Sequence, residues 1–196
     1  MILNKFVIGV TGGSGVGKTV ASRALQEIGA YIINADEVGH RVILKGNEAY
    51  LDIIDHFGWD VLDKNDEIDR KKLGKIVFND REKLQILSEI THEHIALQIG
   101  MEIFHSKRDF IVIDAPLLIG SGLERFCYKI IGIFAPHDLR ISRICERDGV
   151  SFKDAESRIN SQMSDIELGR YVDIKIYNDC DLEEFEIKVK KAVQSA

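Results

Sequence analysis

The chain has 196 residues with 45% hydrophobic and 30% charged residues, a composition typical of folded rather than disordered proteins. Its net charge of -6 argues against a broad nucleic-acid-binding surface. The three cysteines contain no CxxC pair, which argues against a zinc site or a disulfide framework and is typical of a reducing cytosol. No apolar stretch approaches the ~20 residues that span a bilayer. We therefore expect a single-domain cytoplasmic protein.

The first elements in the chain predict a βαβ unit. Residues 6–10 have the pattern of a buried strand, residues 18–28 have apolar residues at helical spacing, and residues 31–33 form a second short strand. This order predicts a parallel sheet. Residues 35–100 are then mostly helical by pattern, with a polar loop at 58–67, and predict an inserted helical lobe.

The second half of the chain alternates between strand and helix patterns. We expect strands at 110–114, 129–135 and 171–178, and helices at 138–147, 152–163 and 182–193. The predicted fold is a three-layer α/β/α P-loop kinase with a central parallel sheet. Its expected parts are a core at about 1–35, 100–139 and 169–196, a helical substrate lobe at 36–99 and a helical lid at 140–168.

A complete GxxxxGK[ST] motif joins the first strand to the first helix. In this position backbone N–H groups and the helix N-terminus favour phosphate oxygens. The motif therefore predicts an ATP-binding phosphate loop, in which the lysine reaches the β- and γ-phosphates and the threonine hydroxyl binds Mg²⁺. The residues are Gly12, Gly13, Ser14, Gly15, Val16, Gly17, Lys18 and Thr19.

An acidic residue ends the third predicted strand. Asp114 follows four apolar residues, which is the pattern of an acid beside the metal of a phosphate loop; the alternative is an Asp that caps the next turn. The segment after it lacks a DxxG switch element, and the chain has no [NT]KxD guanine-reading segment. The sequence therefore favours a kinase over a GTPase switch.

A second carboxylate follows the second strand. Open α/β sheets bind ligands at the carboxyl ends of their strands, so Asp36 could accept the proton of an acceptor hydroxyl. Asp is also a common helix N-cap. The residues alone leave both interpretations open.

Three basic residues lie on the helix that opens the predicted lid. Arg143 and Arg147 are four residues apart on one face and predict a lid that closes over the transferring phosphate, with a solvated helix face as the alternative. Arg140 lies on a different face. Asn178 closes the last strand, where it either borders the adenine or forms a turn.

Segments along nearly the whole chain resemble, in order, the motifs of the dephospho-CoA kinase family. They are residues 11–19 (TGGxGSGKS), 34–40 (DADxxxR/H), 69–78 (DRxxLgxiVF), 87–92 (LexIxHP), 114–118 (DxPLL), and Arg143, Arg147, Arg158 and Gln162 of the lid pattern R…RD…AxxRixxQ. The chain departs from the family in three places. Asn34 replaces the first acid of DAD, Glu93 replaces a proline, and Gly120 replaces a glutamate after PLL.

The resemblance implies that ATP phosphorylates the ribose 3′-hydroxyl of dephospho-CoA, giving coenzyme A and ADP, the last step of CoA biosynthesis. It implies that Asp36 is the base, with Lys18, Arg143 and Arg147 acting on the phosphates, and that Thr19 and Asp114 lie near Mg²⁺. The candidate substrate contacts on the matching segments are Asp36, His40, Arg70, Lys71, His92 and Leu117.

Two other functions stay open at this point. One is a small P-loop kinase acting on a nucleoside or a sugar, and the other is a nucleotide-binding switch without acceptor chemistry. For the favoured kinase we expect ATP, Mg²⁺ and a small-molecule substrate, and no nucleic acid, membrane or obligate protein partner.

Overall fold

The computed structural model describes residues 5–194, so the chain ends of the predicted core lie outside the described residues. The chain divides into two compact units. One consists of Met1–Ile33 and Phe104–Ala196, and the other of Asn34–Ile103. We call them the sheet unit and the helical unit, and describe each by itself.

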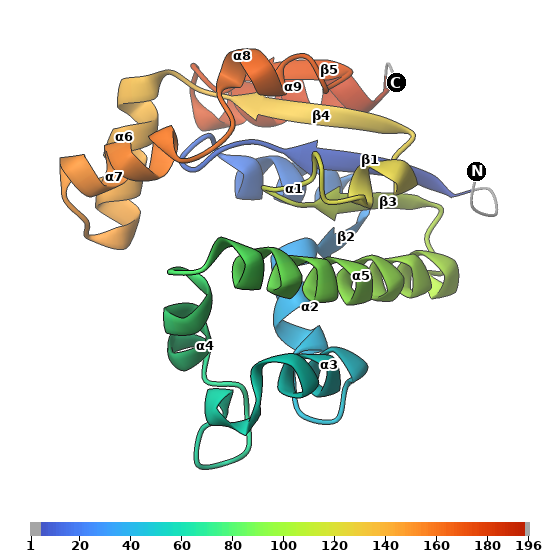
Figure 1. Cartoon of the computed structure of the whole chain (residues 1–196). Coiled ribbons are helices and arrows are strands. Elements are labelled where there is room, and N and C mark those ends of the chain that lie inside the picture. The colour runs from blue at the N-terminus through green and yellow to red at the C-terminus, as the bar shows by residue number, and fades with distance from the viewer. Residues whose placement is uncertain (1–4, 195–196) are drawn as a thin grey trace. The chain divides into compact units, whose positions relative to one another are not determined.

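The sheet unit is built on a five-stranded sheet in the order β2-β3-β1-β4-β5 (Figure 1). Its strands are β1 (Phe6–Thr11), β2 (Tyr31–Asn34), β3 (Phe110–Asp114), β4 (Lys129–Phe134) and β5 (Ile174–Tyr177). The central strand β1 pairs in parallel with both β3 and β4, and β4 pairs in parallel with β5. In this register Val10 lies opposite Asp114 and Thr11 opposite Gly132. The carboxyl ends of β1 and β3 therefore lie together at one edge of the sheet.

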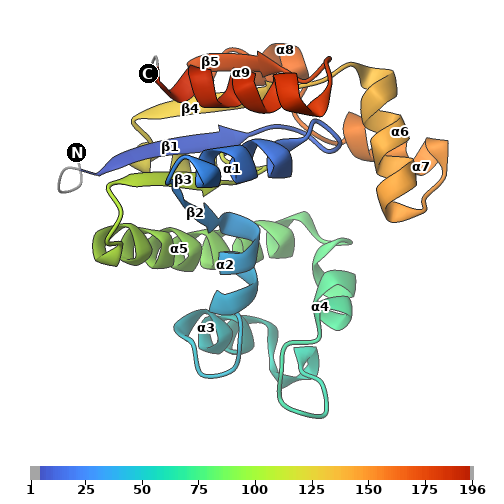
Figure 2. The same cartoon turned by 180° about the vertical axis from the view of Figure 1, so that it is seen from behind.

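Two helices pack side by side on the sheet, α1 (Lys18–Glu27) and α9 (Leu182–Gln194) (Figure 2). Their apolar residues recur at helical spacing, so each helix turns one face to the sheet. Leu25 of α1 and Phe185 of α9 are fully buried in a core that also includes Ile8 and Ile131 of the strands. This core fixes α1 behind the phosphate loop.

Three helices between β4 and β5 form a smaller cluster, α6 (His137–Asp148), α7 (Phe152–Asn160) and α8 (Asp165–Leu168). Ile144 of α6 and Ala155 of α7 are fully buried in a core of their own. Gly149 ends α6 in the left-handed region with φ 66°, and the Ser151 hydroxyl caps α7 by accepting from the Asp154 N–H. The expected last strand, 171–178, is shorter in the structure, where β5 covers only Ile174–Tyr177.

The helical unit contains α2 (Ala35–Val42), α3 (Glu48–Phe57), the short 3₁₀ helix η1 (Trp59–Val61), α4 (Arg70–Val77) and most of α5 (Arg81–His105). Another 3₁₀ helix, η2 (Leu123–Phe126), belongs to the sheet unit. Ile53, Val61 and Val77 are buried in a core that α3, η1 and α4 share. Glu93, where the family pattern has proline, lies inside the continuous helix α5.

No helix within residues 5–194 is long and apolar enough to cross a membrane.

Candidate active site

The phosphate loop leaves β1 and enters α1 through residues with positive φ. Gly15 has φ +79° and Gly17 has φ +95°, and Gly17 is the N-cap of α1. These left-handed conformations favour glycine. A side chain on Gly17 would also collide with the Asn178 amide. Glycine at positions 15 and 17 is therefore required by the backbone that the loop adopts.

The lysine of the motif lies beside the carboxylate that ends β3. Lys18 forms an ion pair with Asp114, and the Ser22 hydroxyl donates to the other oxygen of that carboxylate at 2.6 Å. The Asp114 side chain is 6% exposed, so its charge is paired inside the protein. Ser22 was not identified from the sequence; it lies one helical turn after Lys18, a spacing that could have pointed to it.

The described residues contain no group of three or more His, Cys, Asp or Glu side chains that could hold a metal ion. Mg²⁺ commonly binds proteins through one or two groups, with phosphates and water as the other ligands. The Thr19 hydroxyl, at the second position of α1, and the Asp114 carboxylate fit this pattern because they offer hard oxygen ligands at the phosphate loop.

Asn178 and Arg143 support the phosphate loop from outside. The buried Asn178 donates from Nδ2 to the Val16 carbonyl at 2.8 Å. Arg143 donates to the Gly15 carbonyl at 3.2 Å and to Asn178 Oδ1 at 3.3 Å. The Asn178 amide therefore bonds to the loop and to the arginine.

Arg147 lies away from this network. It donates to both carboxylate oxygens of Asp148, at 2.7 and 2.9 Å, and Arg158 also pairs with Asp148. The hydrogen bonds from Arg147, and next those from Arg158, hold the pKa of the Asp148 carboxyl below its usual range. Of the two arginines predicted for the lid, the structure brings Arg143 to the phosphate loop and leaves Arg147 in an exposed ion pair.

The residue that caps α2 is not Asp36, which was one of the two interpretations of that residue. Asn34 is the N-cap, and its Oδ1 accepts from the N–H groups of Asp36 and Glu37 at 3.0 and 3.2 Å. The interpretation of Asp36 as a cap is therefore wrong, because the cap lies two residues earlier. Asn34 replaces an acid of the family pattern, and its side-chain oxygen accepts backbone N–H groups as an Asp would.

A cavity of about 520 Å³ within the helical unit brings together three of the predicted substrate contacts. Asp36 and His40 reach it from α2, and Arg70 from the first residue of α4. Its other lining residues are Ala35, Gly39, Ile43, Ile53, Leu73, Gly74, Val77, Phe78, Leu84, Leu87, Ser88, Thr91 and Ile95. The cavity can therefore hold a partly apolar ligand with a carboxylate, an imidazole and a guanidinium around it.

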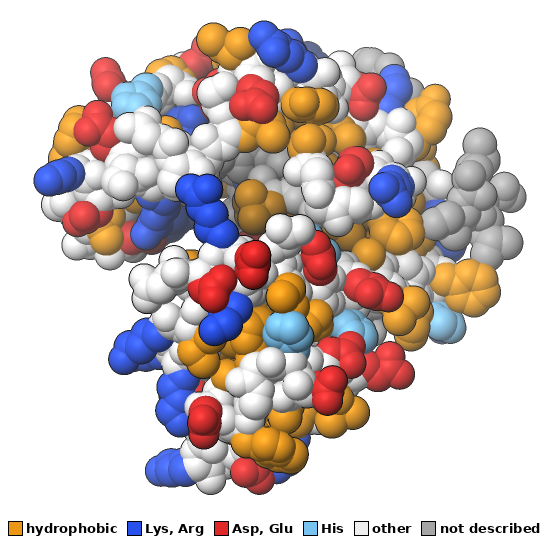
Figure 3. Space-filling view, viewed as in Figure 1, with side chains coloured by type: hydrophobic (Ala, Val, Ile, Leu, Met, Phe, Trp, Pro, Cys, Tyr) orange, Lys and Arg blue, Asp and Glu red, His pale blue; other side chains and the backbone are white. Residues whose placement is uncertain are grey.

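Basic side chains gather on α4, as Figure 3 shows at the lower left. Arg70, Lys71, Lys72 and Lys75 are all exposed there. The Lys71 N–H donates to the α4 cap Asp69, and Lys72 Nζ donates to the Leu62 carbonyl. Of the predicted pair Arg70 and Lys71, only Arg70 lines the cavity.

The remaining two predicted contacts lie elsewhere. His92 is exposed on α5 and does not line the cavity, whereas its neighbour Thr91 does. Leu117 is 72% exposed in the segment after β3, in the sheet unit. Phe78, which the sequence analysis did not single out, lines the cavity and is 79% exposed. The sequence does not show that this large aromatic side chain at the end of α4 is exposed, so only the structure could point to it.

A phosphate loop between a parallel strand and a helix, with its lysine beside a strand-terminal carboxylate, defines the class of P-loop nucleotide-binding proteins. The sequence model of the dephospho-CoA kinase family matches residues 6–184. A dephospho-CoA kinase of Carboxydothermus hydrogenoformans is 38% identical over 180 residues, which are 90% of this chain and 87% of the relative. The chain therefore belongs to the dephospho-CoA kinase family and is a kinase.

Solved structures agree with this assignment. A dephospho-CoA kinase from Campylobacter jejuni is 30% identical, with a TM-score of 0.71 and 96% of each chain covered. A Thermus thermophilus structure has a TM-score of 0.84 over 97% of each chain at 24% identity, which shows the shared fold. The α/β P-loop kinase fold predicted from the sequence is confirmed.

Proposed function

We propose that this protein transfers the terminal phosphoryl group of ATP to the ribose 3′-hydroxyl of dephospho-CoA, giving coenzyme A and ADP in the last step of CoA biosynthesis. The observation that carries this proposal is the family match, which runs from β1 into α9. The phosphate loop and the Asp36 cavity support it, because they supply one place for a nucleotide and one for an acceptor.

The phosphate loop would hold ATP through its backbone N–H groups and Lys18. Lys18 pairs with Asp114 in the structure, so its ammonium group is held at the loop. From there it would contact the β- and γ-phosphates of bound ATP. Bound Mg²⁺ would offset negative charge on the phosphates, and Thr19 and Asp114 are the residues proposed to hold it. Ser22 keeps the Asp114 carboxylate oriented by donating to its second oxygen.

Asp36 is the proposed base. Its side chain is exposed at the cavity while its own N–H is held by Asn34, so the helix start is fixed and the carboxylate is free to meet an incoming hydroxyl. It would orient the 3′-hydroxyl and accept its proton as the new O–P bond forms and the bond to the ADP oxygen breaks. His40 and Arg70 would contact the rest of the acceptor. Lys71, His92 and Leu117 have weaker support, because none of them lines the cavity.

We place the reaction in the cytoplasm, where thiols stay reduced. The cysteines at 127, 145 and 180 are all unpaired in the structure. Burial raises the pKa of the Cys127 thiol to about 12, which leaves this thiol unreactive at neutral pH.

The decisive experiment follows ADP release from MgATP with dephospho-CoA as acceptor, and with a nucleoside and a sugar in separate reactions. We expect release above the ATP-only control with dephospho-CoA alone, and the product should carry phosphate on the ribose 3′ position by NMR. ADP release with a nucleoside or a sugar, and none with dephospho-CoA, would instead identify a P-loop kinase that acts on that nucleoside or sugar.

The role of Asp36 has its own test. Asp36→Asn keeps the size of the side chain but cannot accept the proton, so we expect kcat to fall by about 10²–10⁴-fold while ADP still binds. The matched control is Glu37→Gln, which changes the adjacent exposed acid of α2 and should leave kcat within two-fold. Unchanged turnover in Asp36→Asn would remove Asp36 from the chemistry.

A further inference from the structure

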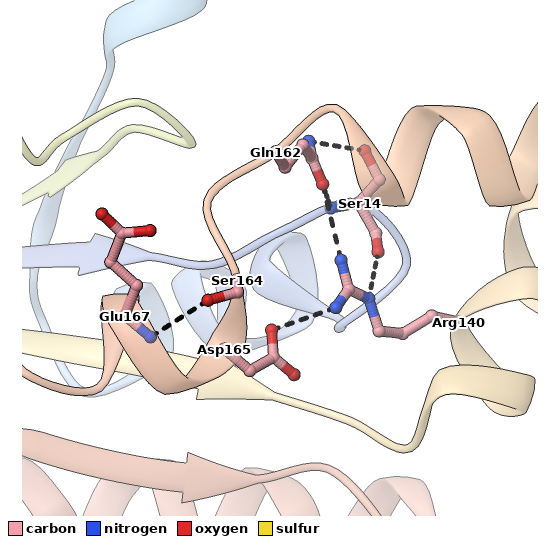
Figure 4. Close-up of polar contacts among 6 residues, drawn as sticks. All are labelled: Ser14, Arg140, Gln162, Ser164, Asp165 and Glu167. Carbon is pink, nitrogen blue, oxygen red and sulfur yellow. Dashed lines mark hydrogen bonds and ion pairs between the residues drawn. The ribbon is translucent and has the colours of Figure 1, made fainter.

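Arg140 of α6 is a buried cation with three partners at the phosphate loop and around it. The residue is 5% exposed. Its Nε donates to the Ser14 carbonyl at 2.9 Å, Nη1 to Asp165 at 3.0 Å, and Nη2 to Gln162 Oε1 at 3.4 Å (Figure 4). A charge is seldom buried unless it is paired and fully hydrogen-bonded. The three partners of Arg140 therefore explain how its charge can be buried, and they indicate what the residue does.

Ser14 is held through all of its polar groups. Gln162, between α7 and α8, accepts from the Ser14 N–H at 2.9 Å and donates to the Ser14 hydroxyl at 3.1 Å (Figure 4). Arg140 takes the remaining group, the carbonyl. The same Gln162 oxygen also receives the Arg140 Nη2, so the two side chains act on Ser14 as one unit.

The backbone carbonyls of the next two residues, Gly15 and Val16, also accept hydrogen bonds from side chains. Arg143 donates to the Gly15 carbonyl and Asn178 to the Val16 carbonyl. In a planar trans peptide the carbonyl and the N–H of the following residue point in opposite directions. Fixing three consecutive carbonyls from outside therefore turns the next three N–H groups to the other side, where a nest of N–H groups binds an anion.

The loop glycines accommodate the close approach of Arg140. A Cβ on Gly15 would lie 2.6 Å from the Arg140 carbonyl oxygen and 2.9 Å from its Cα. A Cβ on Gly13 would collide with the Arg140 guanidinium and lie 2.9 Å from Gln162 Oε1. Arg140 thus packs against the loop with both its backbone and its side chain.

We propose that Arg140, oriented by Asp165 and Gln162, is a positioning residue for phosphoryl transfer. It acts through the Ser14 carbonyl, which sets the direction of the Gly15 N–H toward the phosphates of ATP. Only the planar guanidinium of arginine reaches all three partners at once, because lysine has a single nitrogen at its end. This inference rests on the ATP-dependent transfer proposed above.

The test uses the full-length protein and steady-state kinetics with each substrate varied in turn. In Arg140→Lys we expect kcat/KM for ATP to fall by roughly 10- to 100-fold, as for the loss of a hydrogen bond from a charged group. KM for dephospho-CoA should stay within three-fold, since Arg140 acts on the phosphate loop. Calorimetry with MgADP should show weaker binding by a similar factor.

Asp165→Asn is the second variant, because it keeps the size of the side chain and an oxygen that can accept from Arg140, and because the Asp165 side chain is partly exposed. It should weaken ATP use in the same direction by about 3- to 10-fold. The matched control is Arg108→Lys, an exposed arginine whose backbone bonds to Lys5 and Ser106, and it should behave as the wild type.

Two results would overturn the inference in an active wild-type enzyme. One is a kcat/KM for ATP within two-fold of wild type in both variants, even if their Tm falls, because Arg140 would then serve stability alone. The other is an equal rise of KM for both substrates. An inactive wild type with normal MgADP binding would instead contradict the proposed function, and the calorimetry of the variants would still test the positioning of the loop.

Discussion

The phosphate loop and the cavity lined by Asp36 are organised in opposite ways. Around the loop the polar side chains are buried and bonded to one another: Asp114, Arg140 and Asn178 are only 4–5% exposed. At the cavity the polar side chains Asp36, His40 and Arg70 are exposed, and apolar residues form most of the wall. The loop is thus held in place by the protein, whereas the polar groups at the cavity are open to solvent.

This difference has an energetic meaning. Groups that are fixed before the reaction need no reorganisation while charge moves, which makes them effective at phosphates. Groups in water must lose water before they bind, so each contributes less and tolerates change better. We therefore expect substitutions at the loop to affect ATP strongly, and substitutions of cavity residues other than the proposed base Asp36 to affect the acceptor moderately.

Among the substitutions that test this comparison, the largest effect is expected from Gly15→Ala. The residue has φ +79°, a conformation that costs about 1–2 kcal/mol for alanine, and the new Cβ would meet the backbone of Arg140 at 2.6 Å. We expect kcat/KM for ATP to fall at least ~100-fold. Steady-state kinetics with ATP varied measures this.

Gly46→Ala is the matched control for that variant. Gly46 has a similar φ of +95°, in the loop between α2 and α3, but nothing lies within 4 Å of its Cβ position. It should lower the free energy of unfolding by about 1 kcal/mol and leave both KM values unchanged. If the two variants lose ATP affinity equally, the contact with Arg140 is irrelevant to the loop.

A moderate effect is expected from Phe78→Ala at the cavity. The ring lines the cavity while 79% exposed, so a bound acceptor would cover it. We expect KM for dephospho-CoA to rise roughly 3- to 10-fold, with KM for ATP unchanged. Trp59→Ala, which removes a ring that is 73% exposed on η1, is the control and should change neither value. A rise in KM for ATP alone would contradict the division between the two regions.

The smallest effect concerns the exposed ion pairs of Asp148. Because Arg147 and Arg158 lower the pKa of this carboxyl in the folded protein from its ordinary 3.8, the resulting stability is complete above that pH and is lost as the pH falls through the lowered value. Asp148→Asn should therefore lower Tm by at most about 3 °C at pH 7. The difference from wild type should shrink below pH 3.8, as measured by thermal unfolding across pH.

The control for this pH dependence is Asp60→Asn, which changes an exposed acid of η1. It should keep the pH profile of the wild type. A difference between Asp148→Asn and wild type that is the same at pH 3 and pH 7 would show that the ion pairs do not contribute.

Much of the fold could be predicted from the sequence because its signals are local. The apolar strands, the GxxxxGK[ST] loop and the acid that ends β3 each occupy a few consecutive residues, and parallel pairing then brings Asp114 to the carboxyl end of β1. The departure at Asn34 is local too. The amide oxygen of Asn34 caps α2, so the interpretation of Asp36 as the cap was wrong by two residues.

The sequence by itself therefore determined the class of fold, the phosphate loop and the position of a carboxylate, Asp36, after β2. The tertiary structure alone decided which side chains hold that loop. Arg140, Gln162 and Asn178 lie 126 to 162 positions from the loop atoms to which they bond, and no spacing rule relates them. Their roles arise where α6, the segment before α8 and the end of β5 meet the loop, because a hydrogen bond depends on distance in space.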